Sequence, residues 1–412
     1  MNGNTFSFRM HRKGEITLRI TQLAFLFWFV YQSSYSLVAL FFRNNPALGT
    51  AMVFALKLFF LFLIFMILLS KQIGLKRKNT GLGPKLIILF ILWAGLSILW
   101  TNASSVVVAF VYWFMQFTDI LIVYFFIRIE SIQNIAKSTI KGFVAGSLLL
   151  GLVSIFFSTA NGRIGDAEFL HPNFLGNQFA VAALLSLYMF FDTKLKNKYI
   201  WLLSFILLTS LLIGTVSKTA ILGFFITLIF FWIKSKISFV KKYVILIISI
   251  GGLSVLYNKF LKIWIEYKTI ADGENVQTLS GRTLIWEETW KKINERPFLG
   301  YGFMSFRDNG PDLFGIRLVH AHNEVLTIWF NLGLVGLLIA IFLYIVFLTK
   351  TLSLLKLKEY NHGLLCLLLI VYFSIRGLTE ANSLLINFTL PLFYVLSVWV
   401  ENEEIYKCTL EG

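Results

Sequence analysis

Charged residues are scarce in this chain of 412 residues: they make up 14%, whereas apolar residues make up 57%. Together with a mean hydropathy of +0.76, this composition excludes an ordinary soluble globular domain. Cysteine is scarcer still. Cys366 lies in an apolar stretch and Cys408 near the C-terminus, so we expect neither a disulfide nor a cysteine metal site. No internal repeat is visible, which disfavours a transporter built from inverted repeats.

Long apolar runs are what the chain has instead. A helix that spans a bilayer needs roughly 20 mostly apolar residues. Twelve segments meet this requirement: 20–42, 47–70, 85–101, 104–127, 139–160, 174–191, 199–216, 218–233, 243–260, 324–349, 362–378 and 381–400. The sequence therefore predicts an all-α polytopic membrane protein with about 12 transmembrane helices. Counts of eleven or thirteen stay open, because 199–233 is nearly continuous.

These segments divide the chain into four parts. Transmembrane helices one to nine are predicted in 1–260, a large structured loop in 261–323, helices ten to twelve in 324–400, and a tail in 401–412. The first apolar segment is too long for a signal-peptide core, and no small-residue cleavage site follows it. We therefore expect it to be retained as a helix.

Basic residues set the predicted orientation, because Lys and Arg concentrate in the cytoplasmic loops of membrane proteins. With the N-terminus inside, the inner segments hold 23 Lys and Arg, and the short outer segments hold four: Arg43, Arg163, Lys218 and Arg376. We predict a multi-pass protein of the cytoplasmic (inner) membrane, with both termini cytoplasmic and 261–323 outside. Most of the net charge of +16 then lies next to anionic membrane lipids, so it does not indicate a nucleic-acid partner.

The loop 261–323 is polar and rich in Trp, Arg and Gly. Ser280 is the predicted N-cap of an amphipathic helix that ends before Pro297. Trp286, Trp290 and Ile293 follow at helical spacing and are expected on one face. This predicts a helix whose first turn carries an arginine.

That arginine, Arg282, indicates an anion site, since a cation there is unfavourable for its own helix. Free backbone N–H groups and the guanidinium would converge on a phosphate. A structural alternative is that Arg282 pairs with Glu287, Glu288 or a carbonyl group at a helix C-terminus.

His320 and His322 stand where the apolar pattern resumes, with Asn323 as the expected cap of the next helix. Three readings are open. A zinc site lacks a clear third ligand nearby. The histidines could instead hydrogen-bond loop carbonyl groups. The favoured reading is a histidine that orients or deprotonates a hydroxyl group at the membrane surface.

Other polar residues are expected on the same outer face. Arg163 precedes the segment His171-Pro172-Asn173, Lys218 lies in a tight turn, and Arg376 and Glu380 flank the turn before the last helix. Any one of them could be a solvated side chain. Lys218 is the exception, because a lone cation in an apolar turn needs an anion or carbonyl groups around it.

Lys57 and Asp119 are ionisable residues inside predicted membrane helices two and four. Such groups are costly unless they are functional or paired. We expect them to neutralise each other or Arg43.

Taken together, these motifs resemble the O-antigen ligase and polymerase superfamily of bacterial surface-glycan enzymes. Residues 281–302 carry Gly-Arg, two tryptophans and Pro-Phe-Leu-Gly-Tyr-Gly, and 320–338 read HAHNEVLTIWFNLGLVGLL. The resemblance is most specific over 281–336 and weaker but collinear over about 160–225, whereas the first 150 residues match only in hydropathy.

The resemblance implies a GT-C-like, metal-independent glycosyltransferase without a cofactor, whose donor is a glycan linked to undecaprenyl (polyprenyl) diphosphate. Arg282 matches the loop arginine and His322 the second histidine, the expected catalytic group. Lys218 stands where the family usually has arginine, and a lysine offers a point charge and no bidentate fork. Arg163 completes the expected diphosphate contacts, and the predicted acceptor or supporting residues are His320, Asn323, Trp286, Arg376 and Glu380.

The favoured function is an inverting transferase that polymerises lipid-linked repeat units into a capsule, exopolysaccharide or O-antigen chain. A ligase that moves a finished glycan to lipid A core or another acceptor shares the donor and the site. A flippase of lipid-linked sugars is an alternative of another class, but it predicts charges through the membrane midplane. The implied partners are the lipid-linked donor, a glycan or lipid-linked acceptor, and a chain-length regulator or other assembly proteins.

Overall fold

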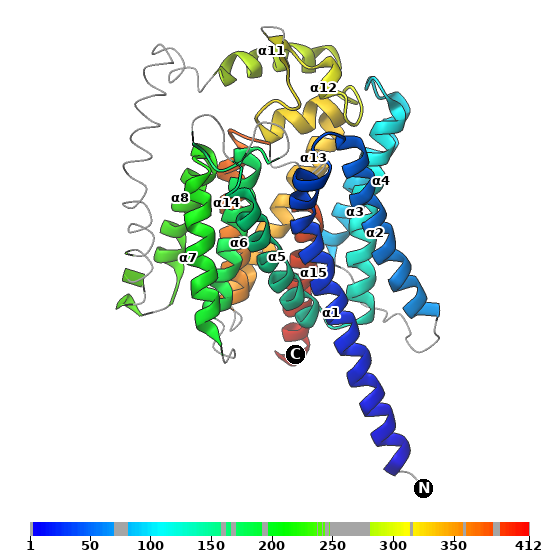
Figure 1. Ribbon diagram of the computed structural model, residues 1–412, viewed down its shortest axis with the longest axis vertical. Helices are drawn as coiled ribbons and strands as arrows, with labels where there is room; N and C mark the ends of the chain where they lie inside the picture. Colours follow the sequence, from blue (N-terminus) through cyan, green and yellow to red (C-terminus); the bar gives the residue numbers. More distant parts are fainter. Residues whose placement is uncertain are drawn as a thin grey trace.

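Apolar runs long enough to cross a bilayer form the helices of a bundle, and shorter elements cover one end of it (Figure 1). The computed structural model describes residues 3–69, 81–157, 162–165, 170–191, 197–236, 238–240, 242–243, 247, 281–313, 316–356, 360–381 and 388–411. In these ranges the bundle helices are α1 (Gly3–Phe41), α2 (Pro46–Leu69), α3 (Leu82–Leu96), α4 (Val106–Ile129), α5 (Ile132–Ser154), α6 (Pro172–Phe191), α7 (Lys198–Gly214), α8 (Lys218–Lys234), α13 (Glu324–Lys356), α14 (Tyr360–Gly377) and α15 (Thr389–Glu411).

The chain is a multi-pass membrane protein. Seven helices of the described part are long and apolar enough to cross a bilayer: Ile20–Phe41, Pro46–Leu69, Leu82–Trp100, Val106–Ile129, Ile132–Ser154, Pro172–Phe191 and Glu324–Lys356. Lys198–Gly214 and Asn361–Gly377 are apolar but shorter. The nearly continuous segment 199–233 is two helices that part at residues 215–217. The predicted ninth span, 243–260, lies almost wholly outside the described residues, as does 261–280.

The helices α5 and α15 start away from the starts of the predicted apolar segments. Helix α5 begins at Ile132 and not at 139, because the Ser131 hydroxyl accepts a hydrogen bond from the Asn134 amide at 3.3 Å and caps a polar first turn. Helix α15 begins at Thr389 and not at 381. Hydropathy alone missed both, because it marks where a helix becomes apolar and not where its backbone starts.

Close packing in the bundle depends on small residues. A Cβ atom on Gly142 of α5 would lie 2.3 Å from the Phe25 carbonyl oxygen of α1, and one on Gly146 would lie 2.5 Å from that of Phe29. The two backbones can approach only because these side chains are absent, as is usual between membrane helices. Helix α6 lies deep in the bundle, and its first turn supplies Asn173 to the site below.

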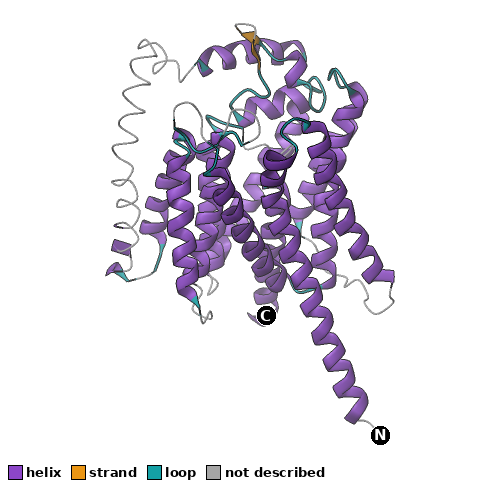
Figure 2. Cartoon of the chain, viewed as in Figure 1, coloured by secondary structure: helices purple, strands orange, loops and turns teal. Residues whose placement is uncertain are grey.

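A layer of short elements covers the end of the bundle opposite the C-terminus (Figures 1 and 2). It holds α11 (Arg282–Glu295), α12 (Phe306–Asn309) and a two-stranded antiparallel hairpin, β1 (Asp312–Leu313) and β2 (Ile316–Arg317). Backbone hydrogen bonds fasten it to α13, from Tyr301 to Phe330 at 2.9 Å and from Gly302 to Asn331 at 2.8 Å. The part of the predicted loop from 281 to 323 is thus a structured layer.

The same layer is tied to the connection between α3 and α4, which includes a 3-10 turn (Ser97–Trp100). The Asn102 amide donates to the Tyr301 carbonyl oxygen at 2.9 Å, and Asp308 accepts from the Ser104 amide at 2.8 Å. One edge of the layer is therefore fixed to the bundle.

The two charges inside the bundle form an ion pair. Lys57 Nζ of α2 lies 2.7 Å from Asp119 Oδ2 of α4, and the Asp119 side chain is fully buried. The ammonium group also lies 4.5 Å from the centre of the Tyr31 ring. The prediction that Lys57 and Asp119 neutralise each other is confirmed.

Candidate active site

Glu380 is the centre of a polar cluster beneath the layer. It follows α14, whose last turn holds Arg376, and only 4% of its side chain is exposed. Its Oε1 atom lies 2.9 Å from His322 Nδ1 and 3.5 Å from His320 Nε2. Its Oε2 atom accepts from Asn173 Nδ2 at 3.0 Å and from Arg282 at 3.3 Å. One carboxylate thus joins α6, α11, the histidine segment and the end of α14.

The histidines are positioned by the start of α13. Asn323 caps this helix as predicted, since its Oδ1 accepts from the Leu326 amide at 3.1 Å. Its Nδ2 also donates to the Leu378 carbonyl oxygen at 3.0 Å, which ties the helix start to the turn of Glu380. His322 has a φ of 50°, a left-handed backbone that few residues other than glycine adopt. This geometry turns its ring towards the carboxylate.

The hydrogen-bond pattern assigns the protons on the two rings. His320 Nδ1 accepts from the His322 backbone amide at 3.1 Å, so a neutral His320 carries its proton on Nε2. His322 Nδ1 faces the carboxylate at 2.9 Å and therefore carries a proton. In neutral His322 the Nε2 atom is left as a proton acceptor.

Electrostatics support these assignments. Burial would raise the pKa of Glu380, but the hydrogen bond from His322 and the positive charge of Arg376 hold that pKa well below its usual range. The carboxyl group is therefore ionised. Burial lowers the pKa of His320 to about 4, despite the nearby Glu380 charge, so this ring is neutral at physiological pH.

Arg282 is the first residue of α11, where the sequence predicted an anion-binding arginine. The predicted cap is wrong: Gly281 is the N-cap, with a φ of 80° that glycine adopts without strain, and Ser280 lies outside the described residues. The predicted alternative of a pair with Glu287 or Glu288 is wrong too, since Arg282 pairs with Glu380 and both glutamates pair with Lys291. Arg282 therefore faces the cluster.

The buried face of α11 includes Ile293 as predicted, but it is shifted by one residue at the two tryptophans. Ile285, Thr289 and Ile293 are buried, whereas the side chain of Trp290 is 45% exposed. Trp286 lies at the edge and donates from Nε1 to the Ala321 carbonyl oxygen at 3.0 Å. Trp286 thus supports the histidine segment and holds its backbone under α11.

Asn173 is a member that sequence reasoning named in a motif but did not place in the site. Its Oδ1 atom lies 3.1 Å from the Ser217 hydroxyl and 3.4 Å from a guanidinium nitrogen of Arg163. Its carbonyl oxygen accepts from Arg376 at 3.1 Å. The asparagine therefore connects Arg163 and Arg376 to Glu380, and a polar residue right after a helix-starting proline was the available signal.

Arg163 and Lys218 are placed differently. Arg163 donates from Nε to the Thr215 carbonyl oxygen at 2.9 Å, in the turn between α7 and α8. Lys218 follows in that turn as the first residue of α8, and its side chain is exposed. Its neighbour Ser217 contacts Asn173 of the cluster. Lys218 therefore lies at the border of the site, whereas Arg163, Arg282 and Arg376 line it.

Two histidines and Glu380 together could also hold a metal ion. Ligand atoms of His320, His322 and Glu380 lie within 4.8 Å of one another. The prediction that the histidines lack a third ligand is therefore wrong, because Glu380 comes from a distant part of the chain. The same carboxylate, however, already accepts from Arg282, and Arg163 and Arg376 contact the adjoining Asn173. Three guanidinium groups against one carboxylate favour an anion over a cation.

Part of this chain is similar to known proteins. Residues 203–341 match the O-antigen ligase family, and this range includes Lys218, Arg282, His320 and His322. A general O-oligosaccharyltransferase of Acinetobacter baylyi is 24% identical over 201 residues, which cover 43% of this chain and 34% of that protein. The chain thus spans about a third of the length of this distant relative. The resemblance to the O-antigen ligase family that the sequence predicted is thereby confirmed over residues 203–341.

Proposed function

We propose that this chain is a glycosyltransferase that polymerises oligosaccharide repeat units linked to polyprenyl diphosphate into a surface polysaccharide. The reaction takes place at the outer face of the cytoplasmic membrane. The partners are the undecaprenyl-diphosphate-linked donor, a glycan or lipid-linked acceptor, and a chain-length regulator or other assembly proteins.

The observation that carries this proposal is the position of Glu380 between His322 and Arg282. One carboxylate oxygen contacts the ring of His322, the proposed proton acceptor, and the other oxygen contacts Arg282. A base and an anion-binding group within reach of one carboxylate are what transfer from a diphosphate donor requires. The family match over residues 203–341 supports the same class of reaction.

In the proposed step, a hydroxyl group of the acceptor gives its proton to His322 Nε2. The hydroxyl oxygen attacks the anomeric carbon from the face opposite the diphosphate, and the bond from that carbon to the diphosphate oxygen breaks. The electron pair leaves with polyprenyl diphosphate, so the configuration at the anomeric carbon inverts. Glu380 stabilises the imidazolium that forms, as a carboxylate does in other acid–base pairs.

Arg282 and Arg163, with Lys218 at the rim, would stabilise the charge that develops on the departing diphosphate. This role needs no metal ion, because the guanidinium groups supply the positive charge. His320 would remain neutral and support the backbone of His322, to whose amide it is hydrogen-bonded at 3.1 Å.

The proposal includes the predicted topology. The proposed protein has about 12 transmembrane helices in a GT-C-like arrangement, one for each segment of roughly 20 apolar residues. Both termini are cytoplasmic, 261–323 forms the extracytoplasmic part between helices nine and ten, and 401–412 is a tail. In this orientation the layer of α11 and α12 faces the compartment in which surface glycans grow.

A second candidate is transfer of a finished glycan to another acceptor. The matched family is described as O-antigen ligase, and the relative is named an O-oligosaccharyltransferase. Donor and site would be unchanged, and only the acceptor would differ.

Reconstitution tests the proposal. The purified full chain, in lipid nanodiscs with polyprenyl-diphosphate oligosaccharide, should form longer glycans in the presence of EDTA. His322→Ala should bind the donor yet lose transfer by about 10²–10⁴-fold, the usual contribution of an acid–base group. His320→Ala should retain more activity than His322→Ala. Undiminished transfer by His322→Ala, or activity that EDTA removes and a divalent metal restores, would overturn the mechanism.

A further inference from the structure

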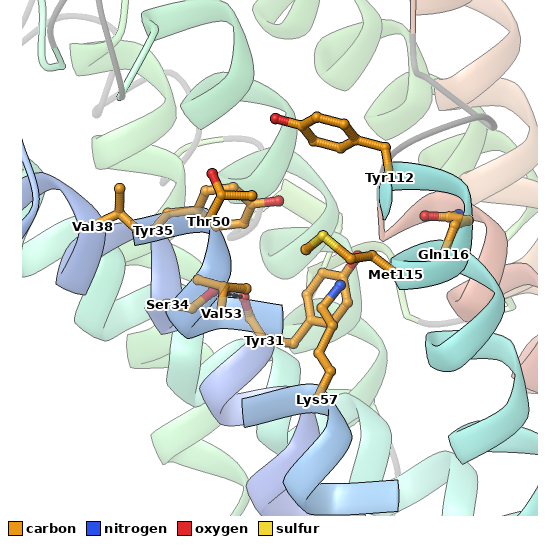
Figure 3. A pocket seen from close by; sticks show the side chains of 10 residues that line it. All are labelled: Tyr31, Ser34, Tyr35, Val38, Thr50, Val53, Lys57, Tyr112, Met115 and Gln116. Atoms are coloured by element: carbon orange, nitrogen blue, oxygen red, sulfur yellow. Dashed lines mark hydrogen bonds between the residues drawn. The ribbon is translucent and has the colours of Figure 1, made fainter. Parts of the chain in front are cut away.

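A cavity of about 270 Å³ lies between α1, α2 and α4, apart from the Glu380 cluster (Figure 3). Its lining includes Val38, Thr50 and Tyr112, which lie towards the layer end of these helices. Along α2 it extends from Thr50 to Lys57, seven residues or about 10 Å of helix. The cavity is therefore sunk below the end of the bundle.

Its lining is unusually polar for the interior of a membrane protein. Seven of the ten lining residues carry a polar group: Tyr31, Ser34, Tyr35, Thr50, Lys57, Tyr112 and Gln116. Figure 3 shows Tyr35, Thr50 and Tyr112 reaching towards the same space, with Lys57 rising alongside Tyr31. Three of these groups are already satisfied within the protein, since Ser34 donates to the Tyr31 carbonyl oxygen, Thr50 to that of Pro46, and Lys57 to Asp119. A polar group without such a partner is costly at membrane depth, so it favours a polar occupant.

The charge of the cavity is balanced internally. Lys57 is held at 2.7 Å by Asp119 and lies over the Tyr31 ring, so it is not available as a free cation for a phosphate. The hydroxyl groups of Tyr35 and Tyr112 have no hydrogen-bond partner among the described residues. What the cavity offers is neutral hydroxyl groups, an amide and aromatic faces, which suit a sugar ring.

The cavity is connected to the Glu380 cluster through two neighbouring residues of α6. The Tyr35 ring packs on Phe174 of α6, with ring centres 4.6 Å apart. Phe174 directly follows Asn173, which donates to Glu380. A glycan whose reacting end lies at His322 could therefore place a neighbouring sugar against Tyr35.

We propose that this cavity is a subsite for a neutral sugar of the glycan substrate, bound through the Tyr35 and Tyr112 hydroxyl groups. The proposal rests on the proposed function in taking the substrate to be a glycan. It assigns a binding role to the first 150 residues, outside the range that matches the O-antigen ligase family.

The test is binding without turnover. Wild-type protein, Tyr35→Phe, Tyr112→Phe and the double variant are compared in nanodiscs by equilibrium dialysis. The probe is the oligosaccharide repeat unit released by mild acid from the lipid-linked donor of the source cell. Each lost neutral hydrogen bond should raise the Kd by about 2- to 12-fold, and the double variant should show the larger effect. Tyr344→Phe is the matched control, since Tyr344 packs on Phe393 and does not line the cavity.

The outcomes separate this proposal from the proposed function. Wild-type affinity in the double variant overturns the subsite, and so does an equal loss of affinity for polyprenyl diphosphate without sugar. His322→Ala should bind the oligosaccharide normally, because its ring is not in the cavity. If His322→Ala kept full transfer while Tyr35→Phe weakened binding, the mechanism would fail and the subsite would stand. A rise in KM for the acceptor or for the donor, with kcat unchanged, then assigns the sugar to that substrate.

Discussion

At the scale of single residues, the chemistry of the site depends on the negative charge of Glu380. Glu380→Gln keeps the shape of the side chain but removes the charge that stabilises protonated His322. We expect kcat for glycan transfer to fall by about 10²-fold, the lower end of the acid–base range. The measurement is single-turnover transfer in nanodiscs. Glu287→Gln on the exposed face of α11 is the control and should be near wild type. Equal rates for both variants would contradict a role for the carboxylate.

Arg282 tests the geometry of the proposed diphosphate contact. Arg282→Lys should impair transfer nearly as much as Arg282→Ala, because lysine cannot supply two parallel donors. Lys218→Arg, by contrast, should be tolerated or improve activity, since it restores the residue usual in the family. Transfer rates at equal protein levels measure both effects. Normal glycan assembly by Arg282→Ala would show that diphosphate binding lies elsewhere.

His320 gives the protein a specific dependence on pH. Its pKa is lowered from 6.5 to about 4, so between these values the unfolded chain binds a proton that the folded chain does not. Stability should therefore fall as pH drops from about 6.5 to about 4. The pKa of Glu380 is lowered too, so its own contribution is lost only as pH falls below the unfolded value of 4.5. Of these two residues, only His320 should lower stability between pH 6.5 and pH 4.5.

His320→Gln removes that titration. Between pH 7 and pH 5, the Tm of the variant in nanodiscs should fall less than the Tm of the wild-type protein. Scanning fluorimetry at several pH values measures the difference. Parallel curves for the two proteins would mean that His320 is already protonated when folded.

At the scale of the helices, the pair Lys57–Asp119 joins α2 to α4 in the interior of the bundle. Lys57→Met leaves a buried carboxylate alone and should cost about 3–5 kcal/mol of stability, whereas Lys57→Met/Asp119→Leu should recover most of the loss. Equilibrium unfolding in detergent micelles measures both. Equal destabilisation by the single and double variants would mean that the charges do not offset each other.

The helices are also where sequence reasoning succeeded most and then stopped. Hydropathy located the apolar centres, and Asn323 marked the start of α13, because both signals are local. The one-residue shift on α11 escaped, since Ile285, Thr289 and Ile293 fit helical spacing as well as the tryptophans do. The central role of Glu380 escaped for another reason. Its partners Asn173, Arg282 and His322 lie 207, 98 and 58 residues away along the chain, and no local pattern reports such contacts.

At the scale of the whole molecule, the predicted orientation places the layer of α11 and α12 on the outer face of the cytoplasmic membrane. In a variant with both native cysteines replaced by serine, Thr283→Cys on the exposed surface of α11 should react with a membrane-impermeant maleimide in intact cells. Lys236→Cys, beyond the end of α8, should react only after permeabilisation. The reversed pattern would invert the topology and remove the outer-face site from the proposed function.

The sharing of one carboxylate between Arg282 and His322 links donor binding to the strength of the base. While Arg282 lies 3.3 Å from Glu380, it withdraws negative charge from the group that supports the base. A diphosphate that draws the guanidinium towards itself would leave Glu380 to the histidine and strengthen His322 as a proton acceptor. Donor binding would then precede activation of the base, whichever substrate binds first. Without donor, the weaker base would leave bound acceptor hydroxyl groups unreactive.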